Sequence, residues 1–237
     1  MTVVALFMKS PDSGTAKRRL RPVLSEEAIT RLCEAFAGDL LRKLATLRCD
    51  KKVIACAGEI SSAFAQRKEI SQFSFYVQSG RDLGKRLQNY FHFSFLEGAT
   101  KSVVIGSDSP TLPPLYLEEA FQMLDRFEVV LGPSEDGGYY LIGMCRFIPE
   151  LFQRISWGTE RVFEETLKRL KPDRVGILNR WYDVDTPTDL KRLQGDLDQM
   201  KKRNDPDIPM QTSRLFSEWA ARRRASPGFN EKAGTLT

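Results

Sequence analysis

Short apolar runs recur along the first half of the chain, and glycine, proline, serine or charged residues bound each of them. Runs of this kind are typical of β-strands that are buried on both faces. We predict such strands at residues 3–7, 52–57, 73–77, 102–105 and 128–131.

Helical patterns lie between most of these strands. Ser25 is a predicted N-cap, and apolar residues then recur at helical spacing as far as Leu44. A second helix is predicted over residues 81–96, and a third from just after Pro114 to about residue 126. Because strands alternate with helices, the sequence predicts an α/β fold whose mostly parallel central sheet is covered by helices on both faces.

The last third of the chain is less regular. We predict a strand at 139–144, a helix at 159–170, strand-like segments at 175–178 and 181–184, and a helix from residue 186. The sequence Asn-Asp-Pro-Asp-Ile-Pro, at 204–209, then breaks all periodicity. We therefore predict one domain over residues 1–202 and a basic C-terminal tail over 203–237. The tail is expected to be partly disordered or to form a short docking helix at 213–224.

Charge and cysteine content exclude some classes of protein. The formal charge is +5, but residues 201–237 contain eight Lys and Arg against four Asp and Glu, so this C-terminal segment carries +4 of it. A nearly neutral body argues against a nucleic-acid surface. The four cysteines show no paired spacing typical of a metal site, and no apolar stretch is long enough for a membrane span. We expect a cytoplasmic protein.

The loop after the first predicted strand has the composition of a phosphate-binding loop. Gly14 would let backbone N–H groups approach an anion, while Lys17 and Arg19 would neutralise its charge. The loop matches neither common nucleotide-binding motif. A solvated basic loop is therefore the alternative interpretation.

Asp108 stands at the carboxyl end of the predicted strand at 102–105, where ligands bind in open parallel sheets. Its role is either to cap the following turn or to bind a metal ion. Since Mg²⁺ takes one or two protein carboxylates, a second aspartate should converge on it, and Asp183 and Asp185 are the candidates. They alternate along an extended segment, so one of them is expected to reach the ion. The alternative for Asp185 is a helix cap.

One further loop, at 133–142, combines Asp136 with Gly137 and Gly138. Two glycines allow the backbone to approach a ligand closely. A plain hairpin with a Gly-Gly corner is the alternative interpretation.

Together these segments resemble the DUF2064 family of bacterial GT-A-like transferases, often labelled arsenosugar-biosynthesis glycosyltransferases. The resemblance covers about residues 1–195 and is carried by six blocks in order: Lys9-Ser-Pro with Gly14 and Lys17-Arg-Arg-Leu, Gly80-Arg-Asp-Leu-Gly-Lys-Arg-Leu, Gly106-Ser-Asp-Ser-Pro-Thr-Leu, Glu135-Asp-Gly-Gly-Tyr-Tyr-Leu-Ile-Gly, Trp157 with Val162 and Thr166, and Asp183-Val-Asp-Thr-Pro-Thr-Asp-Leu.

The resemblance implies a GT-A-like fold of three layers, with a nucleotide donor over the first half of the sheet. It implies a set of donor-binding residues: Lys9, Gly14, Lys17 and Arg19 at the phosphates, and Gly80, Asp82 and Leu83 near the base or ribose. It also implies Mg²⁺ or Mn²⁺ held by Asp108 and Asp185, with Asp183 beside them. The sugar or acceptor pocket would be bordered by Asp136, Gly137, Gly138 and Trp157.

The expected activity is a metal-dependent transfer from an activated nucleotide donor to a small-molecule acceptor. The family label favours glycosyl transfer from a nucleotide-diphosphosugar, with Asp136 as a candidate base for the acceptor hydroxyl. The alternatives are a nucleotidyltransferase that uses a nucleoside triphosphate and releases pyrophosphate, and a non-catalytic nucleotide-binding regulator. The oligomeric state stays open.

Overall fold

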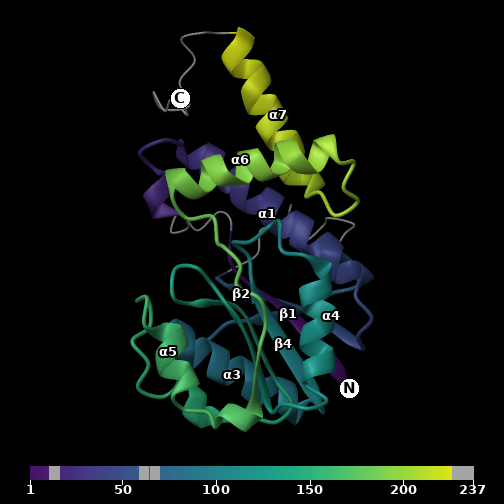
Figure 1. The fold of residues 1–237 in the computed structure, drawn as a ribbon, viewed down its shortest axis with the longest axis vertical. Coiled ribbons are helices and arrows are strands. Elements are labelled where there is room, and N and C mark those ends of the chain that lie inside the picture. Colours follow the sequence, from purple (N-terminus) through teal and green to yellow (C-terminus); the bar gives the residue numbers. More distant parts are fainter. Residues whose placement is uncertain (11–16, 59–63, 65–69, 226–237) are drawn as a thin grey trace.

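A computed structural model describes residues 1–10, 17–58, 64 and 70–225 (Figure 1). The strands of the described part are β1 (Thr2–Lys9), β2 (Lys51–Ala57), β3 (Ser74–Val77), β4 (Lys101–Gly106), β5 (Val129–Pro133), β6 (Tyr139–Met144) and β7 (Val175–Ile177). They form one sheet in the order β3-β2-β1-β4-β6-β5-β7. Only β6 runs against its neighbours, β4 and β5, and the other pairs in the described part are parallel.

The helices of the described part are α1 (Glu26–Thr46), α3 (Leu83–Leu96), α4 (Pro114–Met123), α5 (Val162–Leu167), α6 (Pro187–Lys202) and α7 (Met210–Ala225). Short 3₁₀ turns are η2 (Arg18–Leu20), η4 (Pro149–Phe152) and η5 (Pro172–Arg174). Ser25 caps α1 by accepting a hydrogen bond from the backbone N–H of Ala28. Among the described residues, no helix combines the length and apolarity needed to cross a bilayer.

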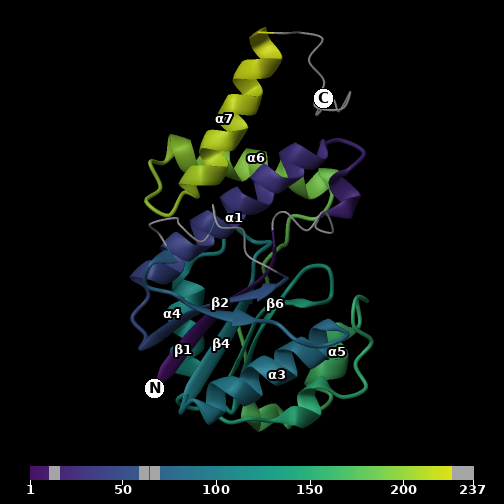
Figure 2. The same cartoon turned by 180° about the vertical axis from the view of Figure 1, so that it is seen from behind.

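Helices cover both faces of the sheet. On one face, Leu40 of α1 and Leu117 of α4 belong to the same buried cluster as Ile105. On the other face, Phe91 of α3 and Leu151 of η4 pack with the opposite side of the strands (Figure 2). This three-layer α/β arrangement confirms the predicted fold class, including its mostly parallel sheet.

A second apolar core lies above the sheet, where α1, α6 and α7 meet (Figure 1). Trp219 of α7 is buried there together with Leu32 and Leu193. The buried carboxylate of Asp39, on α1, accepts hydrogen bonds from the backbone N–H groups of Gln211 and Thr212 at 2.9 and 2.8 Å. Asp39 thus caps the N-terminus of α7 from another helix, which fixes where α7 docks.

Replacing Asp39 should loosen this docking. We expect Asp39→Ala to lower the free energy of unfolding by about 1–3 kcal/mol, because donors at the N-terminus of α7 lose their acceptor. Urea unfolding measures the effect, and the tryptophan emission, to which Trp219 contributes together with Trp157 and Trp181, should move to longer wavelength. Glu118→Ala, at an exposed position on α4, is the matched control. Equal stability of the two variants would contradict the capping role.

Two predicted elements differ from the structure. The helix predicted at 159–170 is shorter, because residues 156–161 form turns in which Thr159 bonds the carbonyl of Ser156. The strand predicted at 181–184 is wrong. Among the described residues, this segment forms a single β-bridge, between Trp181 and Ser134. Its backbone donors bond to loops instead, since Val184 N–H donates to the carbonyl of Asp108 at 2.9 Å.

Candidate active site

Three charged side chains meet at the carboxyl edge of the sheet. The ammonium of Lys17 forms an ion pair with Asp108 Oδ1 and a second with Asp185 Oδ1, the latter at 2.9 Å. The side chain of Lys17 is 2% exposed, whereas those of Asp108 and Asp185 are 45% and 42% exposed. The lysine therefore lies behind the two carboxylates, which face solvent.

The backbone explains why these residues converge. Asp108 follows β4, Asp185 lies just before α6, and the bond from Val184 N–H to the Asp108 carbonyl joins the two segments. The cap of α6 is Thr186, whose hydroxyl and backbone form a reciprocal capping box with Asp189. Asp185 is therefore not the helix cap. Because Thr186 and Asp189 form the cap, the Asp185 carboxylate is available to pair with Lys17.

Electrostatics keep Lys17 charged. Burial alone would lower its pKa, but the charges of Asp108 and Asp185 and their hydrogen bonds outweigh burial and raise the pKa above the ordinary 10.5. The stability linked to the Lys17 proton is therefore fully present in the neutral range and is lost as the pH rises through the raised pKa of the folded state. Lys17 also has a φ of 48°, a left-handed conformation that residues with a Cβ adopt mainly where the surroundings impose it.

Asp183 has a different environment from Asp185. Its two carboxylate oxygens accept hydrogen bonds from the hydroxyls of Ser109 and Ser134, each at 2.5 Å. Burial, followed by the charge of Asp108, raises the pKa of Asp183 to about 6, although both hydroxyls oppose the shift. Asp183 ties the loop after β4 to the β5–β6 hairpin, and its predicted place beside the metal stays a prediction.

Lys43 anchors the same loop from α1. Its buried ammonium donates to the carbonyls of Pro110 and Leu112 at 2.7 and 2.9 Å, which fixes the chain just after Asp108. Burial lowers the pKa of Lys43 to about 8. The sequence gives no sign of this contact, because a lysine on an amphipathic helix is usually solvated.

The pKa of Lys43 predicts how stability changes with pH. In the unfolded chain Lys43 binds a proton up to about its ordinary value of 10.5, whereas the folded protein releases it near 8. Between these limits the unfolded state binds more protons, so the free energy of unfolding should rise with pH. We expect wild type to gain stability relative to Lys43→Met from pH 8 to 10 in urea titrations. A difference that stays constant or shrinks over this range would contradict the assignment.

Residues 133–142 form a hairpin between β5 and β6, and the ligand-binding role predicted for its Asp136, Gly137 and Gly138 stays a prediction. Asp136 accepts a hydrogen bond from the N–H of Gly138 at 2.9 Å and shapes the turn. Gly137 has a φ of 88°, and a Cβ there would lie 2.0 Å from the carbonyl oxygen of Glu160. The hairpin thus packs closely against the segment that follows Trp157.

The other predicted site residues lie around this edge. Lys9 and Arg19 are exposed, at the end of β1 and in η2. Gly14 lies outside the described residues. Asp82 caps α3 by accepting from Lys85 N–H at 2.7 Å, and Leu83 is the exposed first residue of that helix. Gly80, with a φ of 142°, precedes the cap. None of these contacts identifies a ligand, so their donor-binding roles stay predictions.

The residues present suit a divalent cation. The two exposed carboxylates already hold a cation, the Lys17 ammonium, through one oxygen each. Among the described residues, no protein group bonds the second oxygen of Asp108 or of Asp185. Within that same part of the chain, no three His, Cys, Asp or Glu side chains are grouped to hold a metal. An ion there would take its other ligands from water and phosphates, as Mg²⁺ commonly does.

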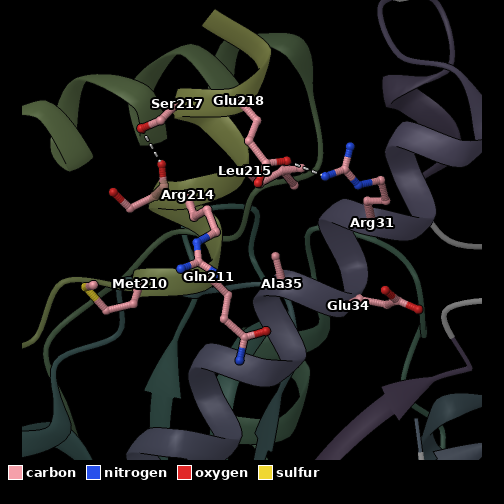
Figure 3. Close-up of a pocket in the computed structure, with 10 residues that line it drawn as sticks. Arg31, Glu34, Ala35, Met210, Gln211, Arg214, Leu215, Ser217 and Glu218 are labelled. Atoms are coloured by element: carbon pink, nitrogen blue, oxygen red, sulfur yellow. Dashed lines mark hydrogen bonds and ion pairs between the residues drawn. The ribbon is translucent and has the colours of Figure 1, made fainter. Parts of the chain in front are cut away.

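A separate hollow of about 570 Å³ lies between α1 and α7 (Figure 3). Arg31 of α1 donates across it to Glu218 of α7 at 2.5 Å. Glu34 and Arg214 add one charge of each sign to its lining. Because the charges balance, the hollow shows no preference for an anion or a cation.

Sequence reasoning missed four residues that shape the site. Ser109, Ser134 and Lys43 hold the loops, and Asp189 forms the capping box. Only Asp189 had a readable signal, since Thr186 and Asp189 have the spacing of a capping box. The pairing of Lys17 with two aspartates was also missed, because the lysine was assigned to phosphate binding alone.

The chain is similar to a protein family and to solved structures. A family model described as "Uncharacterized protein conserved in bacteria (DUF2064)" matches residues 40–159. Among proteins of curated function, none matches the chain. A candidate nucleotide-diphospho-sugar transferase from Desulfovibrio desulfuricans G20 shares 29% identity and superposes with a TM-score of 0.80, over 94% of this chain and 97% of that one.

A cytidylyltransferase from Leptospira borgpetersenii serovar Hardjo-bovis is more distant. It shares 12% identity, with a TM-score of 0.53 over 88% of this chain and 96% of that one. At this identity the likeness concerns the fold alone.

Proposed function

Since the chain belongs to the DUF2064 family, and its site pairs a buried lysine with two half-exposed aspartates, we propose that it is a metal-dependent transferase that uses a nucleotide donor. The reaction we propose is glycosyl transfer from a nucleotide-diphosphosugar to a small acceptor. The observation that carries the proposal is the convergence of Lys17, Asp108 and Asp185 at the carboxyl edge of the sheet, where α/β folds bind their ligands. The similarity to the Desulfovibrio protein supports the nucleotide-sugar donor.

Charge counting explains why the site needs a cation. Two carboxylates and one ammonium sum to one negative charge, which repels a diphosphate. Asp108 and Asp185 would hold a divalent cation, which would reverse that sign and supply positive charge to offset the charge of the departing nucleoside diphosphate.

The protein's own residues then bind and position the substrates. Lys17 and Arg19 neutralise the donor phosphates, and Asp183 keeps the two loops around them in place through Ser109 and Ser134. Asp136, at the exposed tip of the hairpin, would accept the proton of the acceptor hydroxyl. The catalytic work is mainly positioning and charge neutralisation.

The second candidate is nucleotidyl transfer. The fold shared with the Leptospira cytidylyltransferase supports it. The two reactions differ in the bond that breaks. Glycosyl transfer cleaves at the sugar carbon and releases a nucleoside diphosphate, whereas nucleotidyl transfer joins a triphosphate to a phosphorylated acceptor and releases pyrophosphate.

The released phosphate species decides between them. The protein would be incubated with Mg²⁺ or Mn²⁺, a panel of nucleotide sugars and nucleoside triphosphates, and a panel of acceptors. Metal-dependent release of a nucleoside diphosphate is the expected result. Pyrophosphate would establish the second candidate. Nucleotide binding with no turnover on any pair would favour a non-catalytic regulator and contradict both.

A further inference from the structure

A second hollow, of about 710 Å³, lies between the start of α3 and the segment after η4. This volume is within the usual range of small-molecule sites, about 300–1,000 Å³. Phe152, Ile155 and Trp157 supply its apolar lining. Three cations, Arg81, Lys85 and Arg154, stand on its rim.

Packing connects this hollow to the hairpin that carries Asp136. The indole of Trp157 lies over the backbone of α3, where a Cβ at Gly84 would come within 2.1 Å of its Nε1. The indole also contacts the ring of Tyr139, edge-on at 6.4 Å between centroids. Tyr139 begins β6, directly after the Gly-Gly turn. The wall of the hollow therefore packs against the first strand residue after the turn that carries Asp136.

Charge in the hollow is unbalanced. Its one carboxylate, Asp82, caps α3 and contacts Arg81 Nε at 3.3 Å. The Lys85 ammonium donates to the neutral side chain of Gln88 at 2.9 Å. Among the described residues, no carboxylate pairs with Lys85 or with Arg154. Two positive charges thus remain beside an apolar wall.

The backbone at Arg154 is also unusual. Its φ is 53°, in the left-handed region, and its carbonyl accepts a hydrogen bond from the guanidinium of Arg169 at 3.3 Å. Such conformations persist where neighbouring contacts impose them, and they are enriched at binding sites. Arg154 is therefore held at the rim by its backbone, with its own guanidinium left for a ligand.

We propose that this hollow binds the acceptor, and that the acceptor is a small organic phosphate monoester. A monoester carries up to two negative charges at neutral pH, which match the two cations without carboxylate partners. Its carbon skeleton would contact Trp157 and Phe152. The inference rests on the proposed transferase function, because it names the substrate class of that site.

Titration of the ¹⁵N-labelled protein tests this proposal. The indole N–H signal of Trp157, assigned with Trp157→Phe, should shift saturably with glucose 6-phosphate. Gluconate should bind more weakly, and glucose should leave the signal unchanged. Arg154→Gln and Lys85→Gln should each raise the Kd for glucose 6-phosphate about tenfold, as expected for loss of one charge-assisted contact. Lys168→Gln, at the exposed C-cap of α5, is the control that should bind as wild type.

Three results would overturn the proposal: no shift with glucose 6-phosphate, an equal response to glucose or gluconate, or unchanged affinity in both variants. Binding of UDP with Mn²⁺ is measured in the same samples and should be equal in wild type and variants. Failure of wild type to bind any nucleotide would count against the proposed function, whereas the phosphate monoester titration would still report on the hollow.

Discussion

Asp108→Asn should lower turnover about 10²-fold or more while the protein stays folded. Asparagine keeps the size of the side chain but removes a negative charge from the pair that would hold the cation. Electrostatic contacts of this kind are commonly worth several kcal/mol in the transition state, which corresponds to a rate effect of this size. The measurement is kcat at saturating donor and saturating Mn²⁺, with circular dichroism to verify the fold.

Asp198→Asn is the matched control, because Asp198 is an exposed residue of α6. Its carboxylate makes no hydrogen bond or ion pair with the described residues. It should keep full activity. An Asp108→Asn protein that retained most of its turnover in saturating metal would remove Asp108 from the proposed role.

Lys17→Met should produce the second large effect, on turnover and on stability together. Loss of the ammonium leaves Asp108 and Asp185 facing each other without a counter-charge. Because both carboxylates are more than two-fifths exposed, solvent screens much of their repulsion, and we expect a loss of only about 1–2 kcal/mol in unfolding free energy at pH 7. Turnover should fall about 10²-fold, because the donor phosphates lose one cation.

Metal should reverse the stability loss. Without Lys17 the two carboxylates carry two negative charges that no ammonium offsets, so Mn²⁺ should raise the melting temperature of Lys17→Met more than that of wild type. Lys202→Met, at the exposed end of α6, should respond as wild type does. An equal Mn²⁺ response in all three proteins would contradict the idea that Lys17 offsets the charge of the carboxylates that would hold the ion.

Much of the fold follows from local patterns. The apolar runs locate β1 to β5 to within a residue or two, because buried strands between polar loops have a clear signature. Ser25 marks the start of α1 correctly, since capping depends on residues adjacent in sequence. The segment at 181–184 was misread because its extended conformation is satisfied by distant loops, and no local pattern distinguishes that from a strand.

The site was less accessible to sequence reasoning. Strand ends place Asp108 at the sheet's edge, and the short Asp183-Val-Asp185 spacing offers partners, so their neighbourhood could be predicted. The sequence could not predict that Asp183 and Asp185 bond to different partners. Asp183 is held by two serines and Asp185 by a lysine 168 residues away in sequence, and such pairings depend on the packing of distant loops.

Direct titration of Mn²⁺ tests the central claim, that Asp108 and Asp185 form one cation site. Electron paramagnetic resonance would count free Mn²⁺ as it is added to the protein with and without UDP. We predict one ion per wild-type chain, bound more tightly with UDP, and at least tenfold weaker binding in both Asp108→Asn and Asp185→Asn. Unchanged Mn²⁺ binding in a double variant lacking both carboxylates would contradict the account.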